Sequence, residues 1–182
     1  MLQCISLAGI INFNHNFTNL LFRKFMIRYY FLVLFSLAAC QSKKSPNLIE
    51  QDLLSYGIPI TLLVPDSSDI QTMDWGLQKD ITIQGGNGYS LQIFSSQATT
   101  HLVSKLKTDL LETVQENPYF SSIIREDEDG FIYELLIDSL QNFDFRHIKI
   151  QGDREYTFQA GMFGTYKLEQ IEQLYNIARQ AR

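Results

Sequence analysis

The sequence predicts an α+β domain in which an antiparallel sheet of about six or seven strands carries two packed helices, preceded by a signal peptide. Three observations support this prediction. Short segments alternate apolar and polar residues and come in pairs around turn signals, two longer segments repeat apolar residues at helical spacing, and an apolar run lies ahead of Cys40. Paired strands interrupted by single helices favour an antiparallel sheet over a parallel one.

The N-terminal part of the chain has the three features of a secretory signal. Met26, Ile27 and Arg28 give a short basic start, an apolar run extends from Tyr29 to Leu37, and small residues precede Cys40. Polar residues close the run after about a dozen positions, whereas a transmembrane helix needs roughly 20. Leu37-Ala38-Ala39-Cys40 resembles the lipobox of bacterial lipoproteins. This resemblance implies diacylglycerol transfer to the Cys40 thiol, cleavage between Ala39 and Cys40, and acylation of the new amino group.

Four segments follow from this interpretation. Residues 1–25 are an upstream extension with translation starting at Met26, 26–39 are the lipoprotein signal peptide, 40–50 are a lipidated tether and 51–182 are a single α+β domain. One alternative is a long signal that begins at Met1 and uses Arg23, Lys24 and Arg28 as its basic region. Another is a plain signal peptide or buried apolar helix that happens to contain a cysteine. Gln41, in place of Asp, resembles lipoproteins released to the outer membrane of Gram-negative bacteria.

The strands of the domain are predicted from alternation and from turn residues. Residues 58–64 form the first strand candidate, and Pro59 lies near its start, where a missing amide donor is tolerated. The turn at 85–88 joins alternating residues around Ile81 and Ile83 to others around Leu91 and Ile93. Two further hairpins are expected, with strands at 119–125, 131–137, 143–151 and 155–160.

Helical spacing predicts two helices. The first lies between Thr99 and Glu116, with Thr99 or Thr100 as cap and Pro118 as stop, and the second follows Thr165 and ends near Arg182. The order of these elements, with the opening segment 57–65 and Gly161-Met162-Phe163-Gly164 before the last helix, resembles the PsbP and DcrB-like superfamily. The resemblance implies the same scaffold in a noncatalytic accessory or binding role, and it assigns no functional residue.

Composition excludes one class of partner. From Cys40 onward the chain has 12 basic and 20 acidic residues, a formal charge of −8, and no cluster of Lys or Arg. Binding to nucleic acid depends on such clusters, so we expect no nucleic-acid partner. The only cysteines, Cys4 and Cys40, lie at or before the predicted cleavage point, so the domain has no internal disulfide. Tyr156, Phe158, Phe163 and Tyr166 are expected in the core and on the sheet face.

The sequence contains little that points to catalysis or to a cofactor. The domain has two histidines, His101 in the first turn of the predicted helix and His147 in a strand, and both are interpreted as ordinary surface or edge residues. The alternative is an exported hydrolase that uses His147 with an acidic partner. The acidic run 126–129 followed by Gly130 does not fit the calcium-loop spacing, so a hairpin turn is preferred and no metal or cofactor is predicted.

Trp75 is the one candidate binding residue. It is the only tryptophan and lies beside Asp74 and Gly76 in a predicted connection, where it either contacts a partner or covers one end of the core. Taken together, the sequence predicts a membrane-anchored noncatalytic lipoprotein of the cell envelope. Its membrane contact is made by the acyl chains on Cys40, and its partners are envelope proteins or a small ligand.

Overall fold

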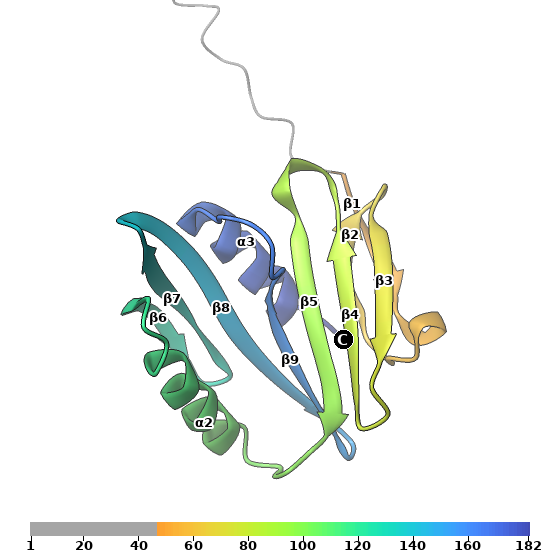
Figure 1. The fold of residues 1–182 in the computed structure, drawn as a ribbon. Helices are drawn as coiled ribbons and strands as arrows, with labels where there is room; N and C mark the ends of the chain where they lie inside the picture. The colour runs from red at the N-terminus through yellow and green to blue at the C-terminus, as the bar shows by residue number, and fades with distance from the viewer. Residues whose placement is uncertain (1–46) are drawn as a thin grey trace, which may run out of the picture. The chain divides into compact units, whose positions relative to one another are not determined.

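Most strands of the domain form where the alternation predicts them, and a computed structural model describes their arrangement for residues 47–182. The larger sheet has seven antiparallel strands in the order β3-β4-β5-β9-β8-β7-β6 (Figure 1). The bounds of these strands are β3 Asp69–Asp74, β4 Gln78–Gln84, β5 Ser90–Gln97, β6 Phe120–Asp127, β7 Gly130–Ile137, β8 Leu140–Gln151 and β9 Arg154–Ala160. A separate pair consists of β1 Leu48–Asp52 and β2 Thr61–Pro65. The predicted α+β class is thereby confirmed.

The two helices lie on opposite faces of the large sheet. Helix α3 (Leu168–Arg179) and the β1-β2 pair cover the rear face in Figure 1, whereas α2 (Val103–Gln115) covers the front of β6, β7 and β8. Helix α2 begins after His101, so that residue is not in its first turn as predicted. Neither helix is long and apolar enough to cross a membrane.

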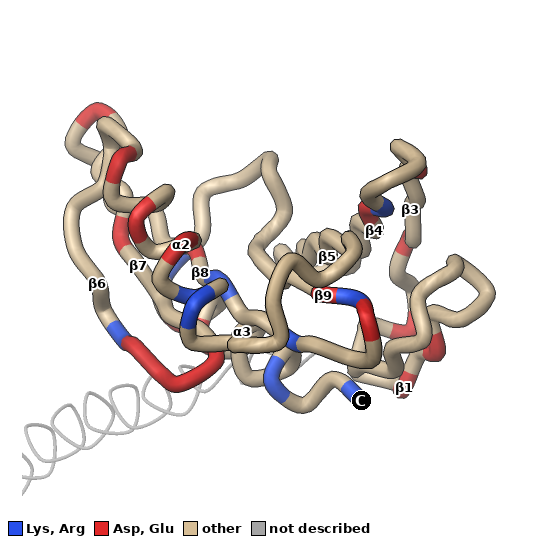
Figure 2. Tube along the Cα trace, turned by 90° about the horizontal axis from the view of Figure 1, so that it is seen from below, with Lys and Arg blue, Asp and Glu red and all other residues tan. Residues whose placement is uncertain are grey.

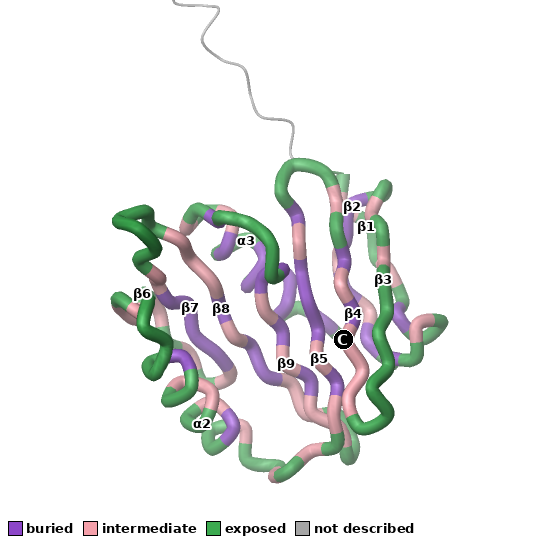
Figure 3. The backbone as a smooth tube through the Cα atoms, viewed as in Figure 1, coloured by how far each residue is buried: buried purple, intermediate pink, exposed green. Residues whose placement is uncertain are grey.

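Side-chain alternation in the strands builds two apolar clusters. Ile93, Phe145 and Phe158 point to the rear face and are fully buried against α3 and the β1-β2 pair. Phe131 and Tyr133, which flank the rear-facing Ile132 on β7, point forward and pack with α2. Figure 3 shows the result, with buried segments along the central strands and exposed ones at the edges and turns.

The edge strands of the large sheet differ from its centre. Strand β3 is exposed along most of its length, and β6 pairs with β7 through two register irregularities, between Phe120 and Ser122 and between Ile123 and Arg125. Such bulges disturb the regular ladder of backbone groups. The central strands β5, β9 and β8 pair in unbroken register.

Two short elements correct the sequence-based boundaries. Strand β1 begins at Leu48, inside the segment 40–50 that was predicted to be a tether, because its backbone pairs with β2 from Leu48 opposite Pro65 to Asp52 opposite Thr61. Strand β3 occupies Asp69–Asp74, for which the sequence predicted a connection and no strand. The cap of α3 is Lys167 and not Thr165, and the backbone amide of Lys167 donates to Gln170 Oε1 at 3.0 Å.

Candidate functional site

Trp75 lies at the tip of the β3-β4 hairpin and is exposed. Its side chain has 65% relative exposure, and its apolar neighbours Met73 and Leu77 have 53% and 89%. Met73, Trp75 and Leu77 are called the hairpin surface below. The alternative in which Trp75 covers one end of the core is wrong, because the hairpin carries the indole out beyond the packed part of the sheet.

The hairpin holds Trp75 in a defined position. The Gly76 amide donates to Asp74 Oδ1 at 2.9 Å, and Gly76 has φ 84°, a left-handed conformation that glycine adopts without steric cost. The backbone amide of Trp75 donates to the Gln78 carbonyl at 2.9 Å, and its indole Nε1 donates to Asp80 Oδ2 at 3.1 Å. The exposed ring is therefore oriented before it meets a partner, which lowers the entropy lost on binding.

The charged groups around the hairpin surface are already paired within the domain. Asp74 accepts from the Gly76 amide and lies 3.3 Å from Lys79 Nζ, and both interactions lower the pKa of its carboxyl. Asp80 accepts a second hydrogen bond from Gln78 Nε2 at 2.7 Å. These pairs leave the apolar side chains as the groups that are free to contact another molecule.

His147 is buried and is not a surface or edge residue as predicted. Strand β8 is internal to the sheet, and His147 points to the rear face with 4% exposure, 5.4 Å from the Phe158 ring and 6.1 Å from the Tyr175 ring between centroids. Burial lowers its pKa to about 4, so the imidazole is neutral near neutral pH. The carboxylate oxygen Asp129 Oδ1 lies 3.8 Å from Nδ1 of His147, beyond hydrogen-bond distance.

This arrangement gives His147 no catalytic geometry. Its Nδ1 atom and Asp129 Oδ1 are both buried, and neither has a hydrogen-bond partner among the described residues. A general base needs a reachable proton on a substrate, whereas the aromatic rings of Phe158 and Tyr175 occupy the space beside this imidazole.

The acidic run at 126–129 covers the end of β6 and the turn into β7, where it appears as a continuous red segment beside a blue residue on β6 (Figure 2). The carboxylates of Glu126 and Asp127 are paired with cations of the same domain. Glu126 lies 2.9 Å from Lys107 Nζ, and Asp127 lies 2.8 Å from Arg125 Nε and accepts from the Tyr175 hydroxyl at 2.9 Å. Across residues 47–182, no three potential ligands converge in a way that would hold a metal ion.

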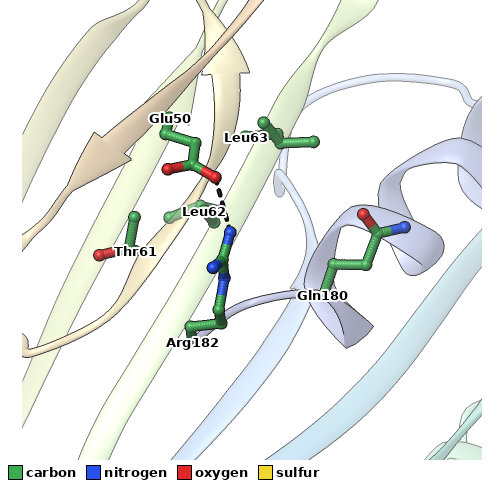
Figure 4. A pocket seen from close by; sticks show the side chains of 6 residues that line it. All are labelled: Glu50, Thr61, Leu62, Leu63, Gln180 and Arg182. Carbon is green, nitrogen blue, oxygen red and sulfur yellow. Dashed lines mark hydrogen bonds and ion pairs between the residues drawn. The ribbon is translucent and has the colours of Figure 1, made fainter.

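A cavity of about 310 Å³ lies between the β1-β2 pair and the end of α3 (Figure 4). Arg182 closes one side of it, with an ion pair to Glu50 Oε1 at 2.6 Å and backbone hydrogen bonds to Thr61 in both directions. The other lining residues are Leu62, Leu63 and Gln180. Its one side-chain hydroxyl belongs to Thr61, its one carboxylate belongs to Glu50 and is paired with Arg182, and its lining includes no histidine, so the cavity offers no hydroxyl–histidine pair of the kind that a hydrolytic triad uses.

The remaining predicted residues divide into three groups. Cys40 and Ala39 lie outside the described residues. Tyr156, Phe158 and Tyr166 are buried as expected. The prediction that Phe163 lies in the core is wrong, because this residue lies in the loop after β9 with 86% exposure. His101 is exposed on the connection before α2.

Sequence reasoning also missed the two apolar neighbours of Trp75. The available signal was the turn residue Gly76 directly after Asp74-Trp75, which indicates a chain reversal that leaves the side chains on either side of it exposed.

Comparison with known proteins adds no functional assignment. No family model matches the chain, and no curated protein matches it. The resemblance to the PsbP and DcrB-like superfamily therefore stays a prediction, and no residue role is transferred from a relative.

Proposed function

We propose that this chain is a lipoprotein of the bacterial cell envelope, held to the outer membrane by acyl chains on Cys40, and that its domain is a noncatalytic binding module. The attachment is supported by the Leu37-Ala38-Ala39-Cys40 motif directly after an apolar run that is too short to span a bilayer. Two or three acyl chains give stable attachment where one chain gives only reversible binding.

The hairpin surface is the observation that carries the binding role. It presents a fixed indole between two exposed apolar side chains and projects from the edge of the sheet. Small molecules bind in concave sites, whereas an exposed tryptophan suits a pocket on another protein, where it buries a large area. An envelope protein is therefore the partner that this geometry supports best.

Replacing Cys40 tests the attachment. Cys40→Ser removes the only thiol that the lipobox can acylate, so the protein should lose incorporation of labelled palmitate and leave the membrane fraction. Ser42→Ala is the matched control, since it changes a side chain two residues after Cys40, leaves the thiol and the lipobox in place and should change neither result. A Cys40→Ser protein that stays in the membrane fraction would refute lipid attachment through this residue.

Photocrosslinking in the native envelope tests the binding role. A photoreactive amino acid at position 77, where the side chain is 89% exposed, should give a discrete crosslinked product, and Trp75→Ala should abolish that product. The same amino acid at exposed Glu112 on α2 serves as the control and should give none. Equal products from positions 77 and 112, or none from 77, would count against the hairpin surface as a binding site.

A further inference from the structure

The loop between β9 and α3 exposes two large apolar side chains that the proposed binding role does not use. Met162 has 70% and Phe163 has 86% relative exposure, and residues 160–166 contain no charge. Figure 3 shows this loop as an exposed segment. Isolated apolar residues are common on protein surfaces, but two adjacent ones at the tip of an uncharged loop give a compact apolar contact.

The base of this loop is held firmly. Tyr166 is buried, its hydroxyl donates to the Gly161 carbonyl at 3.1 Å, and its backbone amide donates to Asn142 Oδ1 at 2.7 Å. The Gly161 amide donates to the Ser90 carbonyl at 3.0 Å. Met162 and Phe163 therefore project from a fixed base.

The loop lies at the end of the domain where the N-terminal segment enters. The Asn47 carbonyl accepts from the Asp66 amide at 3.2 Å, and Leu48 pairs with Pro65. Pro65 also lies against Gly85 at the start of the β4-β5 turn, and the strand that leaves this turn begins at Ser90. We call this the tether end; the β4-β5 turn and the exit of β9 lie there (Figure 1), and residues 84–89 are also uncharged.

The hairpin surface lies at the opposite end of the strands. Strand β3 runs away from the tether end, since Asp69 pairs with Gln84 at its start and Asp74 pairs with Lys79 at its finish. At roughly 3.3 Å per residue, its length separates Leu77 from the tether end by about 20 Å.

We infer that Met162 and Phe163 insert into the surface of the bilayer to which Cys40 is attached. This inference rests on the proposed lipid attachment. Asn47 follows Cys40 by seven residues, and a chain of that length reaches at most about 25 Å, so the tether end is kept close to the lipid. The occupant is a lipid surface because the loop offers apolar atoms without paired charges.

Charges around the loop keep the contact shallow. Lys167 is exposed just beyond the loop, and Asp66 and Asp69 are exposed at the same end of the domain. Moving these groups below the headgroups would be costly, so only the loop tip enters the interface. The contact orients the domain, with the hairpin surface directed away from the membrane.

The mature chain allows this inference to be tested with one fluorescent label. It has no cysteine besides the acylated Cys40, so Met162→Cys introduces a single reactive thiol. The full lipidated protein carries an environment-sensitive dye at this position in vesicles of phosphatidylethanolamine and phosphatidylglycerol. We expect the emission of the dye to be several-fold higher in vesicles than in buffer that contains neither vesicles nor detergent. Spin-labelled lipid in the vesicles should quench this emission strongly.

Two further variants serve as controls. Leu77→Cys carries the same dye at the opposite end of the domain, at a position that is 89% exposed, and should show neither the rise nor the quenching. Adding Phe163→Glu to the Met162→Cys protein should return its emission to the value of the Leu77→Cys protein. Circular dichroism of each protein establishes that it is folded.

The possible failures can be separated by floating the vesicles on a density gradient. Protein that floats with the vesicles but whose dye at position 162 is exposed to water would overturn the loop contact without contradicting the lipid attachment. Protein that does not float would overturn the attachment and, with it, the loop contact. A label that is shielded only in native envelopes, and not in vesicles, would show that the loop meets a protein and would equally overturn the inference.

Discussion

The buried imidazole of His147 should make the stability of the domain depend on pH, and His147→Gln tests this. Burial lowers the native pKa from 6.5 to about 4, while the nearby Asp129 carboxylate opposes the shift. Between these values the unfolded chain binds a proton that the native domain does not bind. The contribution of the neutral His147 to the free energy of unfolding is therefore at its full value above about pH 6.5, and it is lost as the pH falls toward about 4.

The size of the effect follows from the two pKa values. One pKa unit corresponds to about 1.4 kcal/mol, so protonation of His147 should lower the free energy of unfolding by about 2 kcal/mol between about pH 7.5 and about pH 5. Glutamine is uncharged at both pH values. His147→Gln should therefore remove most of this loss, whatever its effect on stability near neutral pH.

Urea denaturation of residues 46–182, which form one compact unit, measures the difference. Carboxylates such as Asp127, whose pKa is lowered by its partners, add a loss at the acid end of the range in both proteins, so the comparison between the two proteins carries the test. His101→Gln is the control, because His101 is exposed, and it should keep the loss of the unchanged domain. An equal loss in the His147→Gln protein would refute the assignment of the proton uptake to this residue.

Three further predictions concern stability and are checked by the same denaturation assay. Asp144→Ala removes the carboxylate 2.7 Å from the largely buried Arg146 and should cost about 3 kcal/mol, whereas a loss under about 1 kcal/mol would show that the cation finds water instead. Gly130→Ala places a methyl group against the Arg146 carbonyl and should cost about 2 kcal/mol or more, while Gly86→Ala, whose added carbon meets open space, should change little. Trp75→Ala should alter stability by less than about 1 kcal/mol, and a larger loss would mean that the indole supports the fold.

The fold could be predicted wherever local pattern and tertiary packing agree. Strands β5 and β9 alternate because one face is buried, and this alternation is visible in the sequence. Strand β3 escaped prediction because both of its faces are largely exposed, so Asp69–Asp74 carries no period of two. Strand β1 escaped because it depends on backbone pairing with β2, an interaction that the residues of β1 alone do not encode.

The site shows the same division. The exposed position of Trp75 follows from a hairpin whose first strand was not recognised. The burial of His147 could have been inferred from Phe145 two residues earlier, because both side chains lie on one face of β8. The exposure of Phe163 could not have been inferred from the sequence. An aromatic residue between Gly161 and Gly164 is equally compatible with a buried turn and with a projecting loop.

The irregular pairing of β6 has a consequence under the proposed lipid attachment, which would hold many copies of the protein on one membrane surface. Molecules confined to a membrane meet far more often than in free solution, and exposed strand edges are the usual route by which sheets fuse into fibrils. The two bulges in β6 and the acidic residues at its end interrupt the row of backbone groups that a second sheet would need. Strand β3 carries Asp69 and Asp74 at its two ends, which places carboxylates opposite each other when two copies of the strand pair antiparallel over their full length. Both edges are thus built to keep neighbouring copies apart.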